Sequence, residues 1–94
     1  MRSYQVNSRI RELSRLQYLK KHPNATCAVC GYNKHIEVHH IKGISTFPDN
    51  ATIDEINNDN NLIGLCPNHH WEIENGMINI SDYLENKIKR GIKL

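Results

Sequence analysis

Apolar side chains in the first part of the chain recur every three or four residues, which is the spacing of one face of an α-helix. The recurring positions are Val6, Ile10, Leu13, Leu16 or Gln17, and Leu19. Pro23 ends the pattern, because the residue before a proline avoids the helical conformation. The pattern therefore predicts a helical arm over residues 1–23.

The middle of the chain holds two short apolar segments of a kind typical of β-strands. Apolar and polar residues alternate over 36–41, and residues 62–65 form an almost continuous apolar run. Residues 42–60 between them are polar and rich in Asn, Asp, Gly and Pro, which predicts a long loop with little regular structure. Pro67 suits the first position of a helix and the Asn-Gly pair at 75–76 suits its end, so a helix is expected between them.

The end of the chain predicts one more strand and one more helix. Residues 77–80 suit a third short strand, and Ser81 suits the N-cap of a last helix. This helix would run through Leu84 and Ile88 and end at Gly91.

Length and composition favour a single small domain. The chain has 94 residues, 38% of them hydrophobic, and we find no internal repeat and no domain linker. We therefore expect one α+β domain over residues 1–94, with the arm at 1–23, a core at 27–76, and a C-terminal strand and helix at 77–94. A core of this size gives marginal stability, and small domains often add a metal ion or disulfides.

Two features of the sequence predict where the protein works. No apolar run approaches the ~20 residues that cross a bilayer. No apolar signal region follows the first residues, Met1 to Gln5. We therefore expect a cytoplasmic protein with no membrane partner.

Charge is distributed unevenly along the chain, although the formal net charge is only +2. Residues 1–26 carry six basic residues against Glu12 alone, a net of +5, whereas residues 27–94 carry a net of −3. The basic side chains of the arm form either a solvated helix face or a surface that contacts phosphates.

The cysteines predict a metal site. The chain has three cysteines and six histidines, and an odd number of cysteines fits a disulfide framework poorly. Two x-x-spaced pairs supply the Cys3His set that tetrahedral zinc takes: Cys27, Cys30, Cys66 and His69. A zinc ion held by all four would be closed and therefore structural. The alternatives are three buried free cysteines, a disulfide from Cys27 to Cys30 or Cys66, and His70 in place of His69.

A second group of residues predicts an open metal site. His39 and His40 are consecutive on a predicted strand, so their side chains point to opposite faces. His70 follows His69 on the predicted helix and faces away from it, and Glu74 lies one turn beyond His70 on the same face. A strand histidine, a helix histidine and a carboxylate can hold a divalent ion and leave positions for water or substrate.

The remaining ring and apolar side chains near these motifs have no such support. We expect His22 and His35 to be exposed, and Trp71 and Ile73 to face the core.

Together these residues resemble the HNH endonucleases. The resemblance rests on four elements in order: Cys27-x-x-Cys30, Val38-His39-His40-Ile41, Asn61-Leu62, and Leu65-Cys66-Pro67-Asn68-His69-His70. It covers about residues 27–76 and implies the ββα-metal fold, also called the His-Me finger. The chain departs from many members at His69, where they have a fourth cysteine, and at Glu74, where they have a histidine.

The resemblance implies a role for each matching residue. His39 and His70 would hold a catalytic divalent cation (Mg²⁺, Mn²⁺, Ni²⁺ or Zn²⁺), with Glu74, a water or a phosphate oxygen as third ligand. His40 would be the general base that activates water. Asn61 would hold the loop and the base in orientation, with Asn60 as its alternative. The structural zinc would be held by Cys27, Cys30, Cys66 and His69.

The implied function is a metal-dependent DNA endonuclease that hydrolyses phosphodiester bonds without a small-molecule cofactor. The alternative is a catalytically inactive, zinc-stapled DNA-binding module of the same fold. Double-stranded DNA is the expected partner, and short members of the family are common in bacteria and their phages. The candidate DNA contacts are Arg9, Arg11, Arg15, Lys20, Lys21 and Lys42, with a second basic patch at Lys87, Lys89, Arg90 and Lys93.

Overall fold

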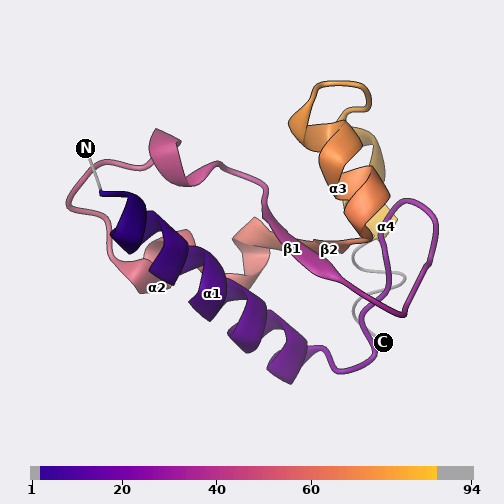
Figure 1. Ribbon diagram of the computed structural model, residues 1–94, viewed down its shortest axis with the longest axis horizontal. Coiled ribbons are helices and arrows are strands. Elements are labelled where there is room, and N and C mark those ends of the chain that lie inside the picture. The colour runs from indigo at the N-terminus through magenta and orange to yellow at the C-terminus, as the bar shows by residue number, and fades with distance from the viewer. Residues whose placement is uncertain (1–2, 87–94) are drawn as a thin grey trace.

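The computed structural model describes residues 3–86, so residues 1–2 and 87–94 lie outside the described part of the chain. Strands β1 (Glu37–His40) and β2 (Leu62–Leu65) form an antiparallel pair in which His40 lies opposite Leu62. The helices are α1 (Tyr4–Lys21), α2 (Ile53–Ile56), α3 (Pro67–Glu74) and α4 (Leu84–Asn86). The sheet lies between α1 on one side and α3 on the other (Figure 1). The fold is α+β, and β1, β2 and α3 follow one another in the predicted ββα order.

Helix α1 has the predicted boundaries but buries a different face. It ends at Lys21, before the Pro23 that the sequence marked as its limit. Its buried positions are Ile10, Ser14 and Tyr18, spaced four residues apart. Val6 and Leu16, which the periodicity placed on the inner face, are 44% and 54% exposed. The predicted stripe is therefore wrong at Val6 and Leu16 but confirmed at Ile10 and at Leu19, which packs against the core. The two exceptions arise because the buried face of α1 also includes a serine and a tyrosine.

The serine on this buried face is satisfied locally. The Ser14 hydroxyl donates a hydrogen bond of 2.7 Å to the carbonyl oxygen of Arg11 in the preceding turn. Because this buried hydroxyl has a backbone partner, its burial costs little free energy. The polar residue type at position 14 therefore did not indicate that the side chain faces the core.

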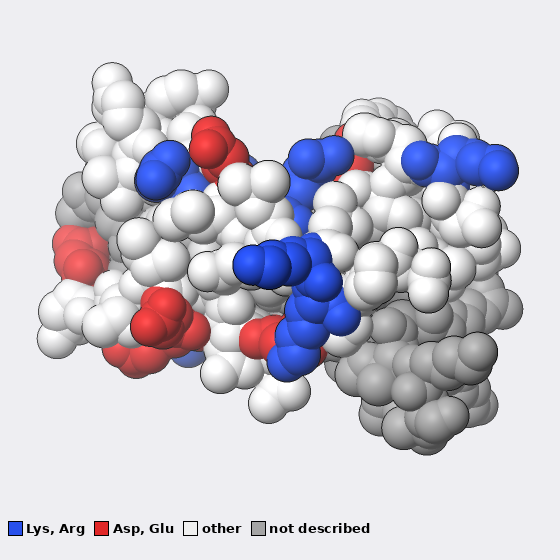
Figure 2. All heavy atoms as spheres, turned by 90° about the horizontal axis from the view of Figure 1, so that it is seen from below, with Lys and Arg blue, Asp and Glu red and all other residues white. Residues whose placement is uncertain are grey.

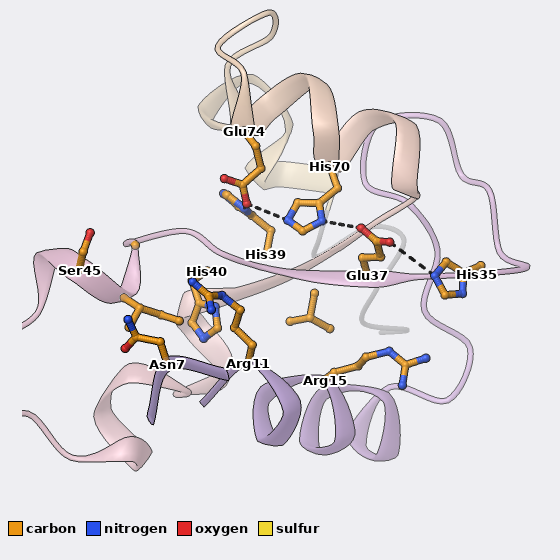
Figure 3. Close-up of a pocket in the computed structure, with 13 residues that line it drawn as sticks. Asn7, Arg11, Arg15, His35, Glu37, His39, His40, Ser45, His70 and Glu74 are labelled. Atoms are coloured by element: carbon orange, nitrogen blue, oxygen red, sulfur yellow. Dashed lines mark hydrogen bonds and ion pairs between the residues drawn. The ribbon is translucent and has the colours of Figure 1, made fainter. Parts of the chain in front are cut away.

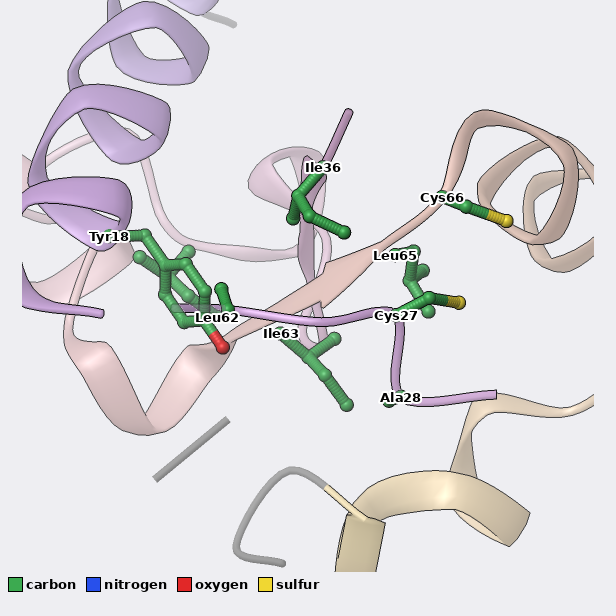
Figure 4. Packing of buried hydrophobic residues seen from close by; sticks show 9 residues of the cluster. Tyr18, Cys27, Ala28, Ile36, Leu62, Ile63, Leu65 and Cys66 are labelled. Carbon is green, nitrogen blue, oxygen red and sulfur yellow. The ribbon is translucent and has the colours of Figure 1, made fainter. Parts of the chain in front are cut away.

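The larger core cluster joins the end of α1 to the sheet and to the cysteine turn. Its members include Tyr18, Cys27, Ile36, Leu62, Ile63 and Leu65 (Figure 4). Gly64 lets these residues approach closely, since a Cβ atom there would lie 3.0 Å from Ile36 Cγ2 and 3.4 Å from the Tyr18 ring. Burial raises the pKa of Tyr18 to about 12, so its hydroxyl stays neutral.

A smaller core cluster holds the long β1–β2 connection against α1. Residues 42–60 are not an unstructured loop, because they contain a 3₁₀ turn at Ile44–Thr46 and helix α2. Helix α2 begins with a capping box formed by Thr52 and Glu55. Ile44 and Ile56 from this segment bury themselves against Ile10 of α1. The connection is therefore a fixed wall beside β1.

His22 was predicted to be exposed, and the structure shows that it is buried. Its Nε2 lies 2.9 Å from Oδ1 of Asp59, and its ring centroid lies 4.5 Å from that of Tyr18. This contact ties the end of α1 to the 3₁₀ turn that leads into β2. His35 is exposed, as predicted.

The third strand predicted at 77–80 is wrong. The chain turns there, with Gly76 at φ +71°, and then enters a 3₁₀ turn at Ile80–Tyr83 that continues into α4. Asn79 caps this segment by accepting a 3.0 Å hydrogen bond from the Ser81 backbone N–H, so the expected cap at Ser81 is also wrong. The continuation of the predicted helix through Ile88 to Gly91 lies outside the described residues.

Helix α3 occupies nearly the span that the sequence predicted, beginning with Pro67 at its first turn. Its Trp71 is 60% exposed rather than core-facing, whereas Ile73 packs against the larger core cluster. No helix in residues 3–86 is both long enough and apolar enough to span a membrane.

Candidate active site and metal-binding clusters

Three cysteines and one histidine from two distant segments converge beside the start of α3. The ligand atoms of Cys27, Cys30, Cys66 and His69 all lie within 4.8 Å of one another. His69 Nδ1 is 3.3 Å from Cys66 Sγ and 3.6 Å from Cys27 Sγ. Ligands about 2.0–2.3 Å from a tetrahedral zinc ion are roughly 3.3–3.8 Å apart, so the cluster fits that ion.

The cysteines are free thiols, which contradicts the disulfide alternative. The Sγ atoms of Cys30 and Cys66 are 4.0 Å apart, about twice a disulfide bond length. His69 rather than His70 joins the cysteines, since consecutive helix residues point about 100° apart.

Local backbone geometry aims the thiols inward. Gly31 has φ +80° and its N–H donates to the Cys27 carbonyl (2.8 Å), which closes the first cysteine turn. Cys66 is the N-cap of α3, and its sulfur accepts a hydrogen bond from the His69 backbone N–H. Burial raises the pKa of the Cys27 thiol, but hydrogen bonds from backbone N–H groups, that of Cys66 foremost, outweigh it and lower the pKa to about 6. A thiolate is therefore available at neutral pH.

Acidification is expected to release a zinc ion from this cluster only below about pH 6. The folded-state pKa of Cys27 is lowered, so its thiolate form is present above that pKa and is lost as the pH falls through it. Bound zinc competes with protons and moves the midpoint of release further down. A colorimetric zinc chelator followed against pH would measure the midpoint. Complete release at neutral pH would contradict this expectation.

A second cluster combines β1 with α3 and uses a different face of that helix from the one that carries His69. His70 Nε2 lies 3.0 Å from Glu74 Oε1, and His39 Nδ1 lies 3.7 Å from the same oxygen. The two imidazole rings meet edge to face with centroids 5.5 Å apart. Burial is the main cause that lowers the pKa of His39, so its ring stays neutral, the form that binds metal ions. One nitrogen or oxygen ligand from each residue lies within 4.8 Å of the others.

Glu37 orients this cluster, and the sequence reasoning missed it. Its Oε1 lies 2.7 Å from His70 Nδ1, so the carboxylate fixes the ring and leaves Nε2 directed at Glu74. A carboxylate on the far nitrogen of a ligating histidine is a common support in metal sites. The available signal was the two-residue spacing from His39, which places both side chains on one face of β1. Glu37 Oε2 also lies 3.6 Å from His35 Nε2.

His40 lies on the other face of β1, toward α1 (Figure 3). Asn57 holds it there. Asn57 Nδ2 donates 3.0 Å to the carbonyl of Ile10, so its Oδ1 faces His40 Nε2 at 2.7 Å. This oxygen can only accept, which assigns the proton of the neutral imidazole to Nε2 and leaves Nδ1 with a lone pair. Burial lowers the pKa of His40, an effect that the nearby Arg11 reinforces.

Asn61 contacts the loop instead of His40. Its Oδ1 accepts from the Lys42 N–H (2.7 Å), and its Nδ2 donates to the carbonyls of Lys42 (3.1 Å) and Ile56 (2.9 Å). Among the described residues the side chain directly against His40 is that of Asn57, so the predicted effect of Asn61 on the base would act through the backbone of Lys42 and stays a prediction. The sequence offered no signal for Asn57, which stood among several similar loop asparagines.

One cavity of about 500 Å³ brings the second cluster and His40 together. In the described part of the chain β1 pairs with β2 alone, so the other edge of β1 has no neighbouring strand. Side chains from both faces of β1 can therefore line one cavity at that edge. The walls come from β1, from α1, from α3 and from the start of the β1–β2 connection (Figure 3). The lining includes His39, His40, His70, Glu74, Arg11 and Arg15.

The comparison with protein families decides what this arrangement belongs to. The family model described as HNH endonuclease matches residues 27–81, which is more than half of the chain. The chain belongs to the HNH endonuclease family. Neither the curated proteins nor the solved structures gave a match.

The HNH match includes both metal-binding clusters, the β-hairpin and α3, but leaves out α1. The contribution of α1 to the cavity therefore comes from outside the matched segment. Endonucleases of the HNH family act on nucleic acid.

Of the basic residues expected to contact DNA, Arg11 and Arg15 of this HNH protein line the cavity. Other candidates are engaged elsewhere: Arg9 pairs with Glu12 at 3.4 Å, Lys21 with Asp59 at 3.8 Å, and Lys42 Nζ lies 4.4 Å from the Phe47 ring centroid. Figure 2 shows the side of the molecule on which α1 lies, with Lys and Arg side chains across its middle. The second basic patch, residues 87–93, lies outside the described residues.

Proposed function

We propose that this protein is a metal-dependent DNA endonuclease whose general base is His40. One observation carries the proposal: a buried, neutral imidazole shares a cavity with a histidine–histidine–carboxylate cluster and two arginines. A binding module needs positive charge for DNA, but it has no use for a neutral base beside a metal-binding cluster.

The proposed reaction is hydrolysis with the 3′ oxygen as leaving group. His40 Nδ1 takes a proton from water, the water oxygen bonds to phosphorus, and the bond from phosphorus to O3′ breaks. A proton from solvent neutralises the departing oxygen. An unperturbed imidazole has a pKa near ~6.5, and burial lowers that of His40, so the base is already deprotonated at neutral pH.

The second cluster fits a divalent cation, and His39, His70 and Glu74 would hold it. Two imidazoles and one carboxylate suit Mn²⁺, Ni²⁺ or Zn²⁺, and Mg²⁺ with more water ligands. Such an ion supplies Lewis-acid stabilisation of the phosphate charge. Glu74 is the third ligand in this proposal, and its position supports this role, since its Oε1 lies 3.0 Å from His70 Nε2 and 3.7 Å from His39 Nδ1.

The cysteine cluster would hold a structural zinc that fastens the 27–31 turn to the start of α3. Because the turn and α3 flank the sheet, this ion would fix the geometry of the active cavity from outside it. We also propose a single domain over residues 1–94 that includes helix α1. Two observations support this: Ile10 of α1 accepts the hydrogen bond from Asn57, and Arg11 and Arg15 of α1 line the cavity.

Double-stranded DNA is the proposed substrate. Arg11 and Arg15 would contact the phosphate at the cavity, and Arg9, Lys20, Lys21 and Lys42 would contact the flanking backbone. These contacts release counterions and carry no base specificity, so affinity should fall steeply with salt.

Supercoiled plasmid provides the test. The purified protein is incubated with Mg²⁺, Mn²⁺ or Ni²⁺, with a sample that receives no added ion as the control, and conversion to nicked or linear DNA is followed on gels. Nicking that requires an ion supports the proposal. Retention of DNA in a mobility-shift assay without nicking by any ion would overturn it in favour of the inactive binding module.

Replacing Asn57 by aspartate is expected to move the acidic limb of the pH–rate profile to higher pH. A carboxylate beside Nε2 stabilises the imidazolium and raises the pKa of His40, so less neutral base is present at a given pH. The matched control is Asn58→Asp, which adds the same charge one residue away on an exposed side chain. Identical acidic limbs for Asn57→Asp and the wild type would show that Asn57 does not act on the base.

A further inference from the structure

A second cavity adjoins the active one and has a different chemical character. Its volume is about 530 Å³, which lies in the range of small-ligand pockets. It is lined mainly by apolar side chains from the end of α3 and the turn that follows: Ile73, Met77, Ile78 and Ile80. His39 lines both cavities, so they meet at the metal-binding cluster.

The side chain that stands out in this cavity is Met77. It is 61% exposed, whereas Ile73 and Ile80 are partly buried against the core. A flexible, polarisable side chain exposed at the mouth of an apolar cavity is suited to the flat face of a ring system. A phosphate group would gain no favourable contact in this apolar cavity. A deoxyribose and the face of a base would gain free energy there, because their apolar surface would be removed from water.

We infer that this apolar cavity is a nucleoside subsite that takes the sugar and base on the 5′ side of the scissile phosphate. The inference rests on the proposed nuclease function, because it places a phosphate at the His39–His70–Glu74 cluster. The nucleoside next to that phosphate is covalently attached to it, and the apolar cavity is the neighbouring space that shares His39.

The two faces of β1 decide which of the two flanking nucleosides enters. In an in-line displacement the attacking water and the leaving oxygen lie on opposite sides of phosphorus. The water is activated beside His40, and His39 projects from the opposite face of the strand. The apolar cavity is lined by His39 and not by His40. The leaving O3′, and the nucleoside that carries it, therefore lie on the side of the apolar cavity.

Cleavage mapping on one substrate tests the assignment. An end-labelled duplex carries a single tetrahydrofuran abasic nucleotide, and cutting of the bonds on either side of it is compared with the intact duplex. The wild type is expected to cut the bond 3′ of the abasic nucleotide about 5- to 10-fold more slowly, the lower end of what base stacking contributes. The bond 5′ of it should change little. Equal loss at both bonds would overturn the assignment.

Variants of Met77 show whether slower cutting beside the abasic nucleotide arises in the apolar cavity or from a general change in the duplex. Met77→Ala should lose most of the discrimination between the two bonds, and Met77→Leu, which keeps the apolar surface, should retain it. Leu16→Ala, an equally exposed apolar residue on α1, is the matched control and should behave as the wild type. Discrimination that persists in Met77→Ala would overturn the inference, and a wild type that cuts no bond would overturn the nuclease function itself.

A binding measurement with mononucleotides in Mg²⁺ gives a readout that does not depend on catalysis, because these ligands contain no internucleotide bond to cut. Thymidine 3′-monophosphate, titrated into ¹⁵N-labelled protein, should shift the amide signals of Met77, Ile78 and Ile80. Thymidine 5′-monophosphate should shift them much less, because its nucleoside lies on the other side of the phosphate. If neither nucleotide shifts these signals, the cavity does not bind the nucleoside and the inference is wrong. The inference is also wrong if the wild type is a dimer in solution that Met77→Ala dissociates, because the cavity then serves as a contact between two copies of the chain.

Discussion

Replacing His40 by alanine is expected to lower kcat for DNA nicking by about 10²–10⁴-fold, the usual contribution of a positioned general base. Asn57 Oδ1 accepts the hydrogen bond from His40 Nε2, so His40 Nδ1 is the only ring nitrogen that can take a proton from water. Binding of DNA without an added divalent ion should change little, since His40 contributes no charge at neutral pH. Single-turnover nicking and a mobility-shift assay would measure the two effects separately.

His22 provides a matched control for this variant. Both histidines are 8% exposed and each contacts one side chain from the β1–β2 connection, so alanine at either position removes a buried ring and one such contact. His22→Ala should therefore lose comparable stability, about 1–3 kcal/mol, and keep kcat. Added imidazole should restore part of the activity of His40→Ala. Equal activities for the two variants would remove His40 from the mechanism.

Loss of the cysteine cluster is expected to unfold the domain. A structural zinc site contributes about 10–16 kcal/mol of binding free energy at neutral pH. The whole free energy of unfolding of an ordinary domain is only about 5–15 kcal/mol, and this chain has a small core. Cys66→Ser, or removal of zinc from the wild type, should abolish the cooperative thermal transition and much of the helical circular dichroism.

Adding different ions back to the metal-free protein shows whether unfolding results from loss of zinc or from another effect of the chelator. Zinc, or cadmium as a second thiolate-binding ion, should restore the circular dichroism of the stripped wild type, whereas Mg²⁺ should not. The chemical shift of bound ¹¹³Cd would also report three sulfur ligands and one nitrogen. A metal-free chain that keeps a native spectrum and a sharp melting transition would show that the cluster is dispensable for folding.

Short-range patterns carried most of the prediction of the fold. The x-x spacing of the cysteine pairs, the consecutive histidines on a strand and the proline at the start of α3 each act within a few residues. Their predicted consequences, two strands and a ligand-bearing helix, match the observed elements. The third strand predicted at 77–80 is wrong because a short run of apolar residues fits a strand and a partly buried turn equally well.

The contacts that hold the active site together join residues far apart in the sequence. Asn57 reaches His40 across 17 positions and Ile10 across 47, and Glu37 reaches His70 across 33. No periodicity or spacing encodes such pairs, because each depends on how α1, the long connection and the sheet pack. The burial of His22 and the exposure of Trp71 have the same origin.

The sequence by itself determined the residue types in the two candidate metal clusters, the order of the strands and α3, and the resemblance to the HNH endonucleases. These features depend on short spacings and local chain geometry. Only the tertiary structure decided which asparagine holds His40, which carboxylate orients His70 and which arginines face the cavity. Hydrogen bonds and burial at those positions are set by the packing of distant segments, and only the folded chain brings the segments into contact.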